Sequence, residues 1–142
     1  MRVVEKAFAY ITNQGRLLVF EHVASDAGVQ VPAGTIRLGE EPETAAVREA
    51  KEETGLGPFW DVEALGVCEF DARPYGKDEL HRRHFFHLPF AGAAFERWRH
   101  HELDPADGDE IAIEFELYWL PLADAGARLA DGHGAFLERI RS

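Results

Sequence analysis

The sequence contains one cysteine, Cys68, among its 142 residues, so it cannot form an internal disulfide and has no CxxC pair to hold a metal. It has no run of apolar residues long enough to span a membrane. Residues 1–6 also lack the apolar core of a secretory signal peptide. These absences predict a protein of the reducing cytoplasm with no membrane partner.

Basic residues are scarce in this chain. The 15 Lys and Arg residues are outnumbered by 26 Asp and Glu residues, which gives a formal net charge of -11. This balance argues against binding to duplex nucleic acid, because such binding needs a basic face. A small phosphorylated substrate stays compatible with it, since a bound metal ion can supply positive charge locally. Most of the acidic residues are expected to do no more than keep the protein soluble.

The size and composition are those of one globular domain. A chain of 142 residues with 46% hydrophobic residues can bury one core. The sequence shows neither an internal repeat nor a linker. We therefore expect a single domain over residues 1–142.

Alternating and periodic hydrophobic residues predict the order of strands and helices. Strands are expected at 3–11, 16–21, 62–70, 81–88 and 111–120. Helices are expected at 43–54, 95–101, 122–129 and 135–141. The strand at 111–120 is the clearest, because every second residue from Ile111 to Trp119 is apolar. Strands before, between and after a central helix predict an α/β protein with a mixed sheet covered by helices on both faces.

The central helix at 43–54 has well-defined ends. Pro42 suits its first turn, where the missing N–H has no partner within the helix. Gly55 suits the position just after the end, which often takes a left-handed conformation. Ala46 and Ala50 form a narrow apolar stripe, so this helix can lie close to a sheet.

Three glutamates of this helix project toward one side. Glu49 is three residues before Glu52 and four before Glu53, and like charges at this spacing destabilise a helix. They also lie near the negative end of the helix dipole, which disfavours carboxylates. A bound cation would offset both costs, and clustered carboxylate oxygens suit a hard divalent ion such as Mg²⁺. Taken alone, the three glutamates also fit a solvated acidic helix.

Two neighbouring features suit the same chemistry. Arg48 lies beside the glutamates, and a guanidinium can hold a carboxylate through two hydrogen bonds and fix its orientation. Residues 34–39 begin and end with glycine and show no regular periodicity. A loop there can fold back over the helix and present backbone groups to a metal or a phosphate.

The segment from Gly34 to Leu56, GTIRLGEEPETAAVREAKEETGL, resembles the Nudix box, G-x5-E-x7-R-E-U-x-E-E-x-G-U, in which U is a bulky aliphatic residue. The matching positions are Gly34, Glu40, Arg48, Glu49, Glu52, Glu53, Gly55 and Leu56. Ala50 occupies the first U position and is smaller than usual. Residues 31–33 and 119–122 also look like the family.

The resemblance implies the Nudix fold, an α/β/α sandwich with a mixed sheet. It implies hydrolysis of a phosphoanhydride bond in a nucleoside diphosphate linked to another group, with Mg²⁺ as cofactor and Mn²⁺ as a substitute. The implied metal ligands and catalytic residues are Glu49, Glu52 and Glu53, with the carbonyl of Ala33 as a further ligand. It implies that Arg48 orients the glutamates and that Glu40 is structural or a water-mediated contact. Gly34 and Gly55 would be required for backbone shape.

The general base can lie in the box or on a later segment. Glu49 is the candidate in the box, and the later candidates are Glu110, Glu114 and Glu116. Glu114 and Glu116 share one face of their predicted strand, opposite the apolar residues. We place Glu114 among the catalytic residues, although a solvent-facing sheet surface explains both glutamates equally well.

A basic cluster and several aromatic residues offer further contacts. In the sequence His81-Arg82-Arg83-His84, strand alternation sends Arg82 and Arg83 to opposite faces, so at most one reaches a phosphate. A solvated strand edge is the favoured interpretation of this cluster. The histidine spacing does not match a zinc site. Tyr75, in a predicted loop, is a better candidate for stacking on a base than Trp119, which we expect in the core.

Several functional alternatives stay open. A Nudix domain can lose catalysis and serve as a nucleotide sensor, but no box glutamate is missing here. Isoprenoid diphosphate isomerases share the fold but need further residues that we do not find. Candidate substrates are nucleoside triphosphates, dinucleoside polyphosphates, ADP-ribose, nucleotide sugars and capped RNA ends. Specificity is expected to depend on residues 71–79 and 95–109, and a homodimer is common in the family.

Overall fold

The computed structural model describes residues 1–103 and 112–140. The strands are β1 (Arg2–Asn13), β2 (Arg16–His22), β3 (Ala33–Thr35), β4 (Glu63–Asp71), β5 (Glu79–Pro89), β6 (Arg97–Leu103) and β7 (Ala112–Pro121). The helices are α1 (Pro42–Thr54) and α2 (Leu122–Arg128), with short 3-10 helices at Arg73–Tyr75 (η1) and Leu137–Arg139 (η3).

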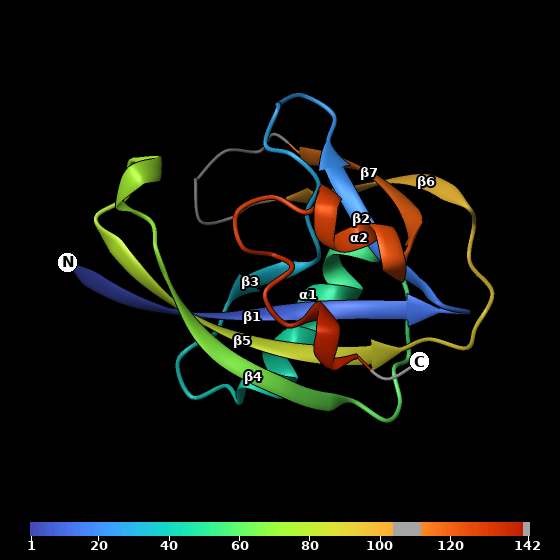
Figure 1. Cartoon of the computed structure of the whole chain (residues 1–142), viewed down its shortest axis with the longest axis horizontal. Coiled ribbons are helices and arrows are strands. Elements are labelled where there is room, and N and C mark those ends of the chain that lie inside the picture. Colours follow the sequence, from blue (N-terminus) through green and yellow to red (C-terminus); the bar gives the residue numbers. More distant parts are fainter. Residues whose placement is uncertain (104–111, 141–142) are drawn as a thin grey trace.

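The seven strands form one mixed sheet in the order β4-β5-β1-β2-β7-β6, and β3 pairs with β1 beside this path (Figure 1). β1 and β5 are parallel, whereas the other pairs are antiparallel. The far end of β1 pairs with β2 at Thr12 and Asn13, while Lys6 to Phe8 pair with β3. β1 therefore changes its neighbour on this side along its length.

Each face of the sheet carries its own core. On one face α1 packs mainly on β1, and its Ala46 and Ala50 share one apolar core with Phe115, Leu117 and Trp119 of β7. The other face is covered by α2 and the turns after it, with a separate apolar cluster. Figure 1 shows α1 and α2 on opposite sides of β1. The predicted mixed sheet with helices on both faces is confirmed.

The alternation predicted for residues 111–120 is also confirmed over the part of β7 that the structure describes. Phe115, Leu117 and Trp119 face α1, whereas Tyr118 and Leu120 face the opposite core. Ile111 lies outside the described residues.

The helix predicted at 95–101 is wrong, because residues 97–103 form the edge strand β6. Arg97 pairs with Glu116 at 2.8 Å and Arg99 pairs with Glu114 at 3.0 Å across the β6–β7 ladder. Trp98, between them, points to the other face and packs on the α1-side core. Pairing with β7 and this alternation override the weak local helical preference.

The helix predicted at 135–141 is wrong as well. Residues 131–136 form turns, and only the 3-10 helix η3 follows. The Phe136 N–H donates to the Tyr10 hydroxyl at 3.2 Å, so a contact with β1 replaces a helical bond there. No helix among residues 1–103 and 112–140 is long and apolar enough to cross a membrane.

Candidate active site

Helix α1 holds its acidic side against β3. Pro42 stands in its first turn, and Gly55 ends it in a left-handed conformation with φ 76° while its N–H bonds to the Lys51 carbonyl. Ala46 and Ala50 are fully buried under the sheet. Small residues on this side let the helix approach closely and bring Glu49 and Glu53, which are buried on the same side, to the β3 backbone.

Two of the box carboxylates are packed against that backbone. A Cβ atom on Gly34 would lie 2.1 Å from Cδ of Glu49, so a larger residue at this position would displace the carboxylate. The Ala33 N–H donates to Oε2 of Glu53 at 2.9 Å. Glu49 and Glu53 are 9% and 7% exposed. Their positions are therefore fixed by the strand as well as by the helix.

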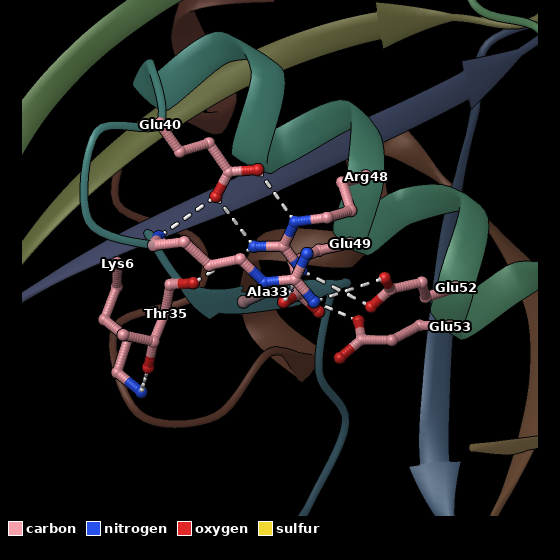
Figure 2. A network of polar contacts seen from close by, with 9 residues as sticks. Lys6, Ala33, Thr35, Glu40, Arg48, Glu49, Glu52 and Glu53 are labelled. Atoms are coloured by element: carbon pink, nitrogen blue, oxygen red, sulfur yellow. Dashed lines mark hydrogen bonds and ion pairs between the residues drawn. The ribbon is translucent and has the colours of Figure 1, made fainter. Parts of the chain in front are cut away.

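Arg48 joins the box glutamates into one network (Figure 2). Its Nε and NH2 donate to the two oxygens of Glu40 at 2.8 and 2.9 Å, and NH2 also donates to the Thr35 carbonyl. Its NH1 donates to Glu49 at 2.7 Å and to Glu52 at 3.4 Å. The two-pronged contact with Glu40 holds the guanidinium in one plane, and the remaining nitrogen orients the other carboxylates.

The network shifts the acidity of its members in opposite directions. Burial raises the pKa of Glu49, although the hydrogen bond from Arg48 works against this. The hydrogen bonds from Arg48 and the Arg37 N–H lower the pKa of Glu40 to about 2. Glu40 is thus held as a carboxylate, while Glu49 takes up a proton more readily than an ordinary glutamate.

The carboxylate oxygens of the box are the type of ligand that a hard divalent cation such as Mg²⁺ prefers. Because Gly34 has no side chain, the Glu49 carboxylate can lie directly against β3. Among the residues described, no three Asp, Glu, His or Cys side chains are already gathered around one point. Glu49 and Glu52 instead turn toward Arg48, and Glu52 is 40% exposed.

A broad cleft of about 1710 Å³ extends from these carboxylates across the sheet. Its lining contains Glu49, Glu52 and Glu53, and it also contains Lys6 of β1 and Arg83 of β5. Phe8, His81, His133, Glu5 and Glu79 belong to the same lining. We call the three box glutamates the acidic wall, and Lys6 with Arg83 the basic wall.

Arg82 and Arg83 point to opposite faces of the sheet, as predicted. Arg82 is exposed and pairs with Glu5 at 3.1 Å. Arg83 is only 5% exposed. The interpretation of this segment as a solvated strand edge is wrong, because β5 lies between β4 and β1 in the interior of the sheet.

Glu114 and Glu116 are both paired with basic residues of β6. Glu114 pairs with Arg99 at 3.0 Å and with His101 at 3.6 Å, and Glu116 pairs with Arg97. Neither glutamate is among the residues that line the cleft. Glu110 lies outside the described residues.

The two aromatic candidates occupy different environments. Trp119 is 9% exposed within the α1-side core, as expected, and its indole N–H donates to the Phe95 carbonyl. Tyr75 is 59% exposed and stacks on Phe70 with 5.5 Å between the ring centroids. Tyr75 is not among the residues that line the cleft.

Lys6 and His133 also line the cleft and were not predicted from the sequence. Lys6 shares a strand face with Val4, Phe8 and Tyr10, so a lysine at an otherwise apolar inward position was a usable signal. His133 lies in a turn just before the residues for which a helix was predicted. Only the folded chain brings it against β1.

Comparison with known proteins agrees with this geometry. The family model described as NUDIX domain matches residues 4–140. An RNA pyrophosphohydrolase of Saccharophagus degradans is 46% identical over 57 residues, which are 40% of this chain. That match spans 33% of the relative's own length.

Solved structures show the same fold. The MutT NUDIX hydrolase of Burkholderia pseudomallei superimposes with a TM-score of 0.69 at 21% identity, over 99% of this chain and 100% of that one. The NUDIX domain of Shewanella oneidensis NrtR complexed with ADP ribose gives a TM-score of 0.65 at 18% identity, over 98% and 85%. The box geometry, the sheet order and a family match over nearly the whole chain lead to one conclusion: this protein belongs to the NUDIX domain family.

Proposed function

We propose that this protein is a divalent-metal-dependent hydrolase that cleaves a phosphoanhydride bond in a small nucleotide, a nucleoside diphosphate linked to another group. The observation that carries this proposal is that Glu49, Glu52, Glu53 and Arg48 all line one broad cleft. The similarity to a protein named RNA pyrophosphohydrolase supports the same bond type. The family match over residues 4–140 also supports a single domain.

The box residues suggest a division of roles. Glu49, Glu52 and Glu53, with the Ala33 carbonyl, would hold Mg²⁺, which neutralises phosphate charge and makes water more acidic when bound. Arg48 orients Glu49 and Glu52 while Glu40 keeps its guanidinium in place. Gly34 gives the Glu49 carboxylate its position beside β3.

Glu49 is the carboxylate that we assign to proton transfer. It is buried beside the cleft, and a raised pKa brings a carboxylate closer to the range in which general bases work efficiently. One oxygen of its carboxylate accepts from Arg48, which leaves the other for a water proton. Glu114 remains an alternative base, although it is paired with Arg99 and is not among the residues that line the cleft.

The test is metal-dependent turnover by the wild type and by Glu52→Gln. Glu52 is suited to this substitution because it is half exposed and takes no part in the packing of Glu49 and Glu53 against β3. We expect phosphate or nucleotide release with Mg²⁺, none with EDTA, and a fall in kcat of at least about 100-fold in Glu52→Gln. A panel of nucleoside triphosphates, ADP-ribose, nucleotide sugars and dinucleoside polyphosphates identifies the substrate class.

Glu43→Gln is the matched control, because Glu43 is an exposed glutamate in the first turn of the same helix. It should keep wild-type turnover. Equal loss in both variants would show a general effect on the helix instead of a role for Glu52. Tight nucleotide binding by the wild type without turnover of any compound would favour a nucleotide sensor over a hydrolase.

A further inference from the structure

A row of directly paired residues crosses the sheet from the box to Arg83. Lys6 of β1 pairs with Thr35 of β3 on one side and with Arg83 of β5 on the other. The Lys6 ammonium donates to the Thr35 hydroxyl at 2.8 Å (Figure 2). Neighbouring strands lie ~4.8 Å apart, so Arg83 is roughly 10 Å from the strand that carries Gly34.

Arg83 is buried without a carboxylate partner. Its guanidinium lies 3.7 Å from the ring centroid of Phe70 and 4.8 Å from that of Phe8. Its NH1 donates to the backbone carbonyl of Asp131 at 2.5 Å. Its Nε is buried and has no hydrogen-bond partner. Within the described part of the chain, no Asp or Glu oxygen lies within 4.0 Å of it.

Another cation lies beside Arg83. Lys6 is its direct neighbour in the row, and the charge of Arg83 helps to lower the pKa of Lys6, although burial is the main cause. The charge of Asp131 favours the guanidinium, but the hydrogen bond between these two residues is made to the Asp131 backbone carbonyl. A buried guanidinium with an unused N–H is costly unless an acceptor meets it. Two neighbouring cations favour a charged acceptor over a neutral carbonyl group.

We propose that Arg83 is a specificity-determining residue that binds an anionic group of the substrate beyond the two phosphates joined by the cleaved bond. This inference rests on the proposed function and adds a substrate class to it. The box wall would receive the scissile diphosphate, and the Lys6–Arg83 wall would receive a further phosphate. Nucleoside polyphosphates are then preferred over nucleoside diphosphates linked to a neutral sugar.

The planar guanidinium between two rings suits this task. Stacking on Phe8 and Phe70 fixes its plane, and a fixed fork matches the geometry of phosphate oxygens. A lysine at the same position keeps the charge but loses the fork. The two side chains should therefore differ in substrate preference.

The experiment compares ATP with ADP-ribose, which share the adenosine diphosphate part. For each compound kcat/KM is measured with Mg²⁺ for the wild type, Arg83→Met, Arg83→Lys and Arg82→Met. We expect Arg83→Met to lower kcat/KM for ATP by about 30-fold and to change that for ADP-ribose less than about threefold. Arg83→Lys should lower kcat/KM for ATP by about fivefold. Arg82→Met, a matched change on the exposed face, should alter neither value.

GTP and GDP-mannose form a second pair with another base. The same fold-changes are expected, because Arg83 is assigned to the additional phosphate and not to the base. Equal losses with both members of a pair would place Arg83 at the shared nucleoside part and overturn the proposal. The proposal would also be overturned if Arg83→Met left the ratio of kcat/KM between the two members of a pair unchanged. A wild-type preference for the sugar-linked member would overturn it as well.

Binding measured by calorimetry separates this inference from the proposed function. With Ca²⁺ in place of Mg²⁺, ATP should bind the wild type more tightly than ADP-ribose, and Arg83→Met should remove the difference. If the wild type shows this pattern without turnover, the hydrolase proposal fails and the assignment of Arg83 stands. If Arg83→Met does not fold, the test of Arg83 rests on Arg83→Lys and on the substrate preference of the wild type. If the wild type binds neither compound, both the hydrolase proposal and the assignment of Arg83 are overturned.

Discussion

Arg48 and Arg83 are both arginines with restricted exposure on the same cleft, yet their surroundings are opposite. Arg48 contacts three carboxylates, those of Glu40, Glu49 and Glu52. Arg83 contacts two aromatic rings and one backbone carbonyl. The comparison teaches that neighbours decide what a buried guanidinium does. One positions acidic groups, and the other is left with capacity for an anion.

The same comparison explains how an acidic protein can bind phosphates. The formal net charge of -11 belongs to the whole surface. Within the cleft, Lys6 and Arg83 face inward, and the acidic wall has the composition that attracts a divalent cation. Local charge of each sign therefore matters more for substrate binding than the overall balance.

Stability should separate the two arginines most strongly. Arg48→Met leaves the partly buried Glu40 and Glu49 without their partner, so we expect the free energy of unfolding to fall by about 3 kcal/mol. Arg83→Met leaves no carboxylate without its partner and removes a desolvated charge. Its free energy of unfolding should therefore fall by less than about 1.5 kcal/mol. Urea titration at pH 7 measures both values. A larger loss in Arg83→Met would mean that its ring contacts stabilise the fold more than the Arg48 network does.

The second prediction sharpens the account of the acidic wall. Gly34→Ala places a Cβ against the Glu49 carboxylate, which is the mobile end of a side chain. We expect the carboxylate to shift, so metal-dependent kcat should fall by about 10- to 100-fold. The free energy of unfolding should fall by roughly 1 kcal/mol. The control is Gly15→Ala in the β1–β2 turn, where φ is 75° and no atom lies near. It should lower stability without lowering kcat, and an unchanged kcat in Gly34→Ala would argue against a precise Glu49 position.

The smallest effect concerns the basic wall and pH. Burial, with a contribution from Arg83, lowers the pKa of His133 to about 3, and its Nδ1 accepts the Val31 N–H at 3.1 Å. The unfolded histidine titrates near 6.5. The neutral ring thus contributes full stability above pH 6.5, and this contribution is lost as the pH falls toward 3.

His133→Asn keeps an acceptor near the same place but does not titrate. Between pH 6 and 4 the wild type should lose about 1 kcal/mol of unfolding free energy per pH unit more than this variant. Chemical denaturation at several pH values measures the two slopes. His101→Asn, which changes a 59% exposed histidine, should keep the wild-type slope. Parallel slopes in all three proteins would show that folding does not lower the pKa of His133.

The box illustrates what local sequence predicts well. The spacing of Arg48, Glu49, Glu52 and Glu53 places them together on any helix, and Pro42 and Gly55 mark its ends without reference to the rest of the chain. The strand alternation that separated Arg82 from Arg83 is local in the same sense. These features follow from helix and strand geometry over a few residues.

Residues 97–103 and 131–136 illustrate the limit. No pattern within residues 97–103 predicts that they pair with the edge of β7, as Arg97 and Arg99 do. The turn that carries His133 depends on Tyr10, whose hydroxyl donates to the His133 carbonyl across 123 positions of sequence. Both predicted helices failed because distant partners took over their hydrogen bonds.

The family, the acidic helix and the alternation of strand faces can be predicted from the amino-acid order, since each depends on spacing within a short segment. The position of β5 inside the sheet, the pairing of Lys6 with Arg83, and the contacts of that guanidinium with Phe8 and Phe70 follow from the folded chain alone. Strand order and burial arise from contacts between residues far apart in the chain, and those contacts set the charge that each side of the cleft presents.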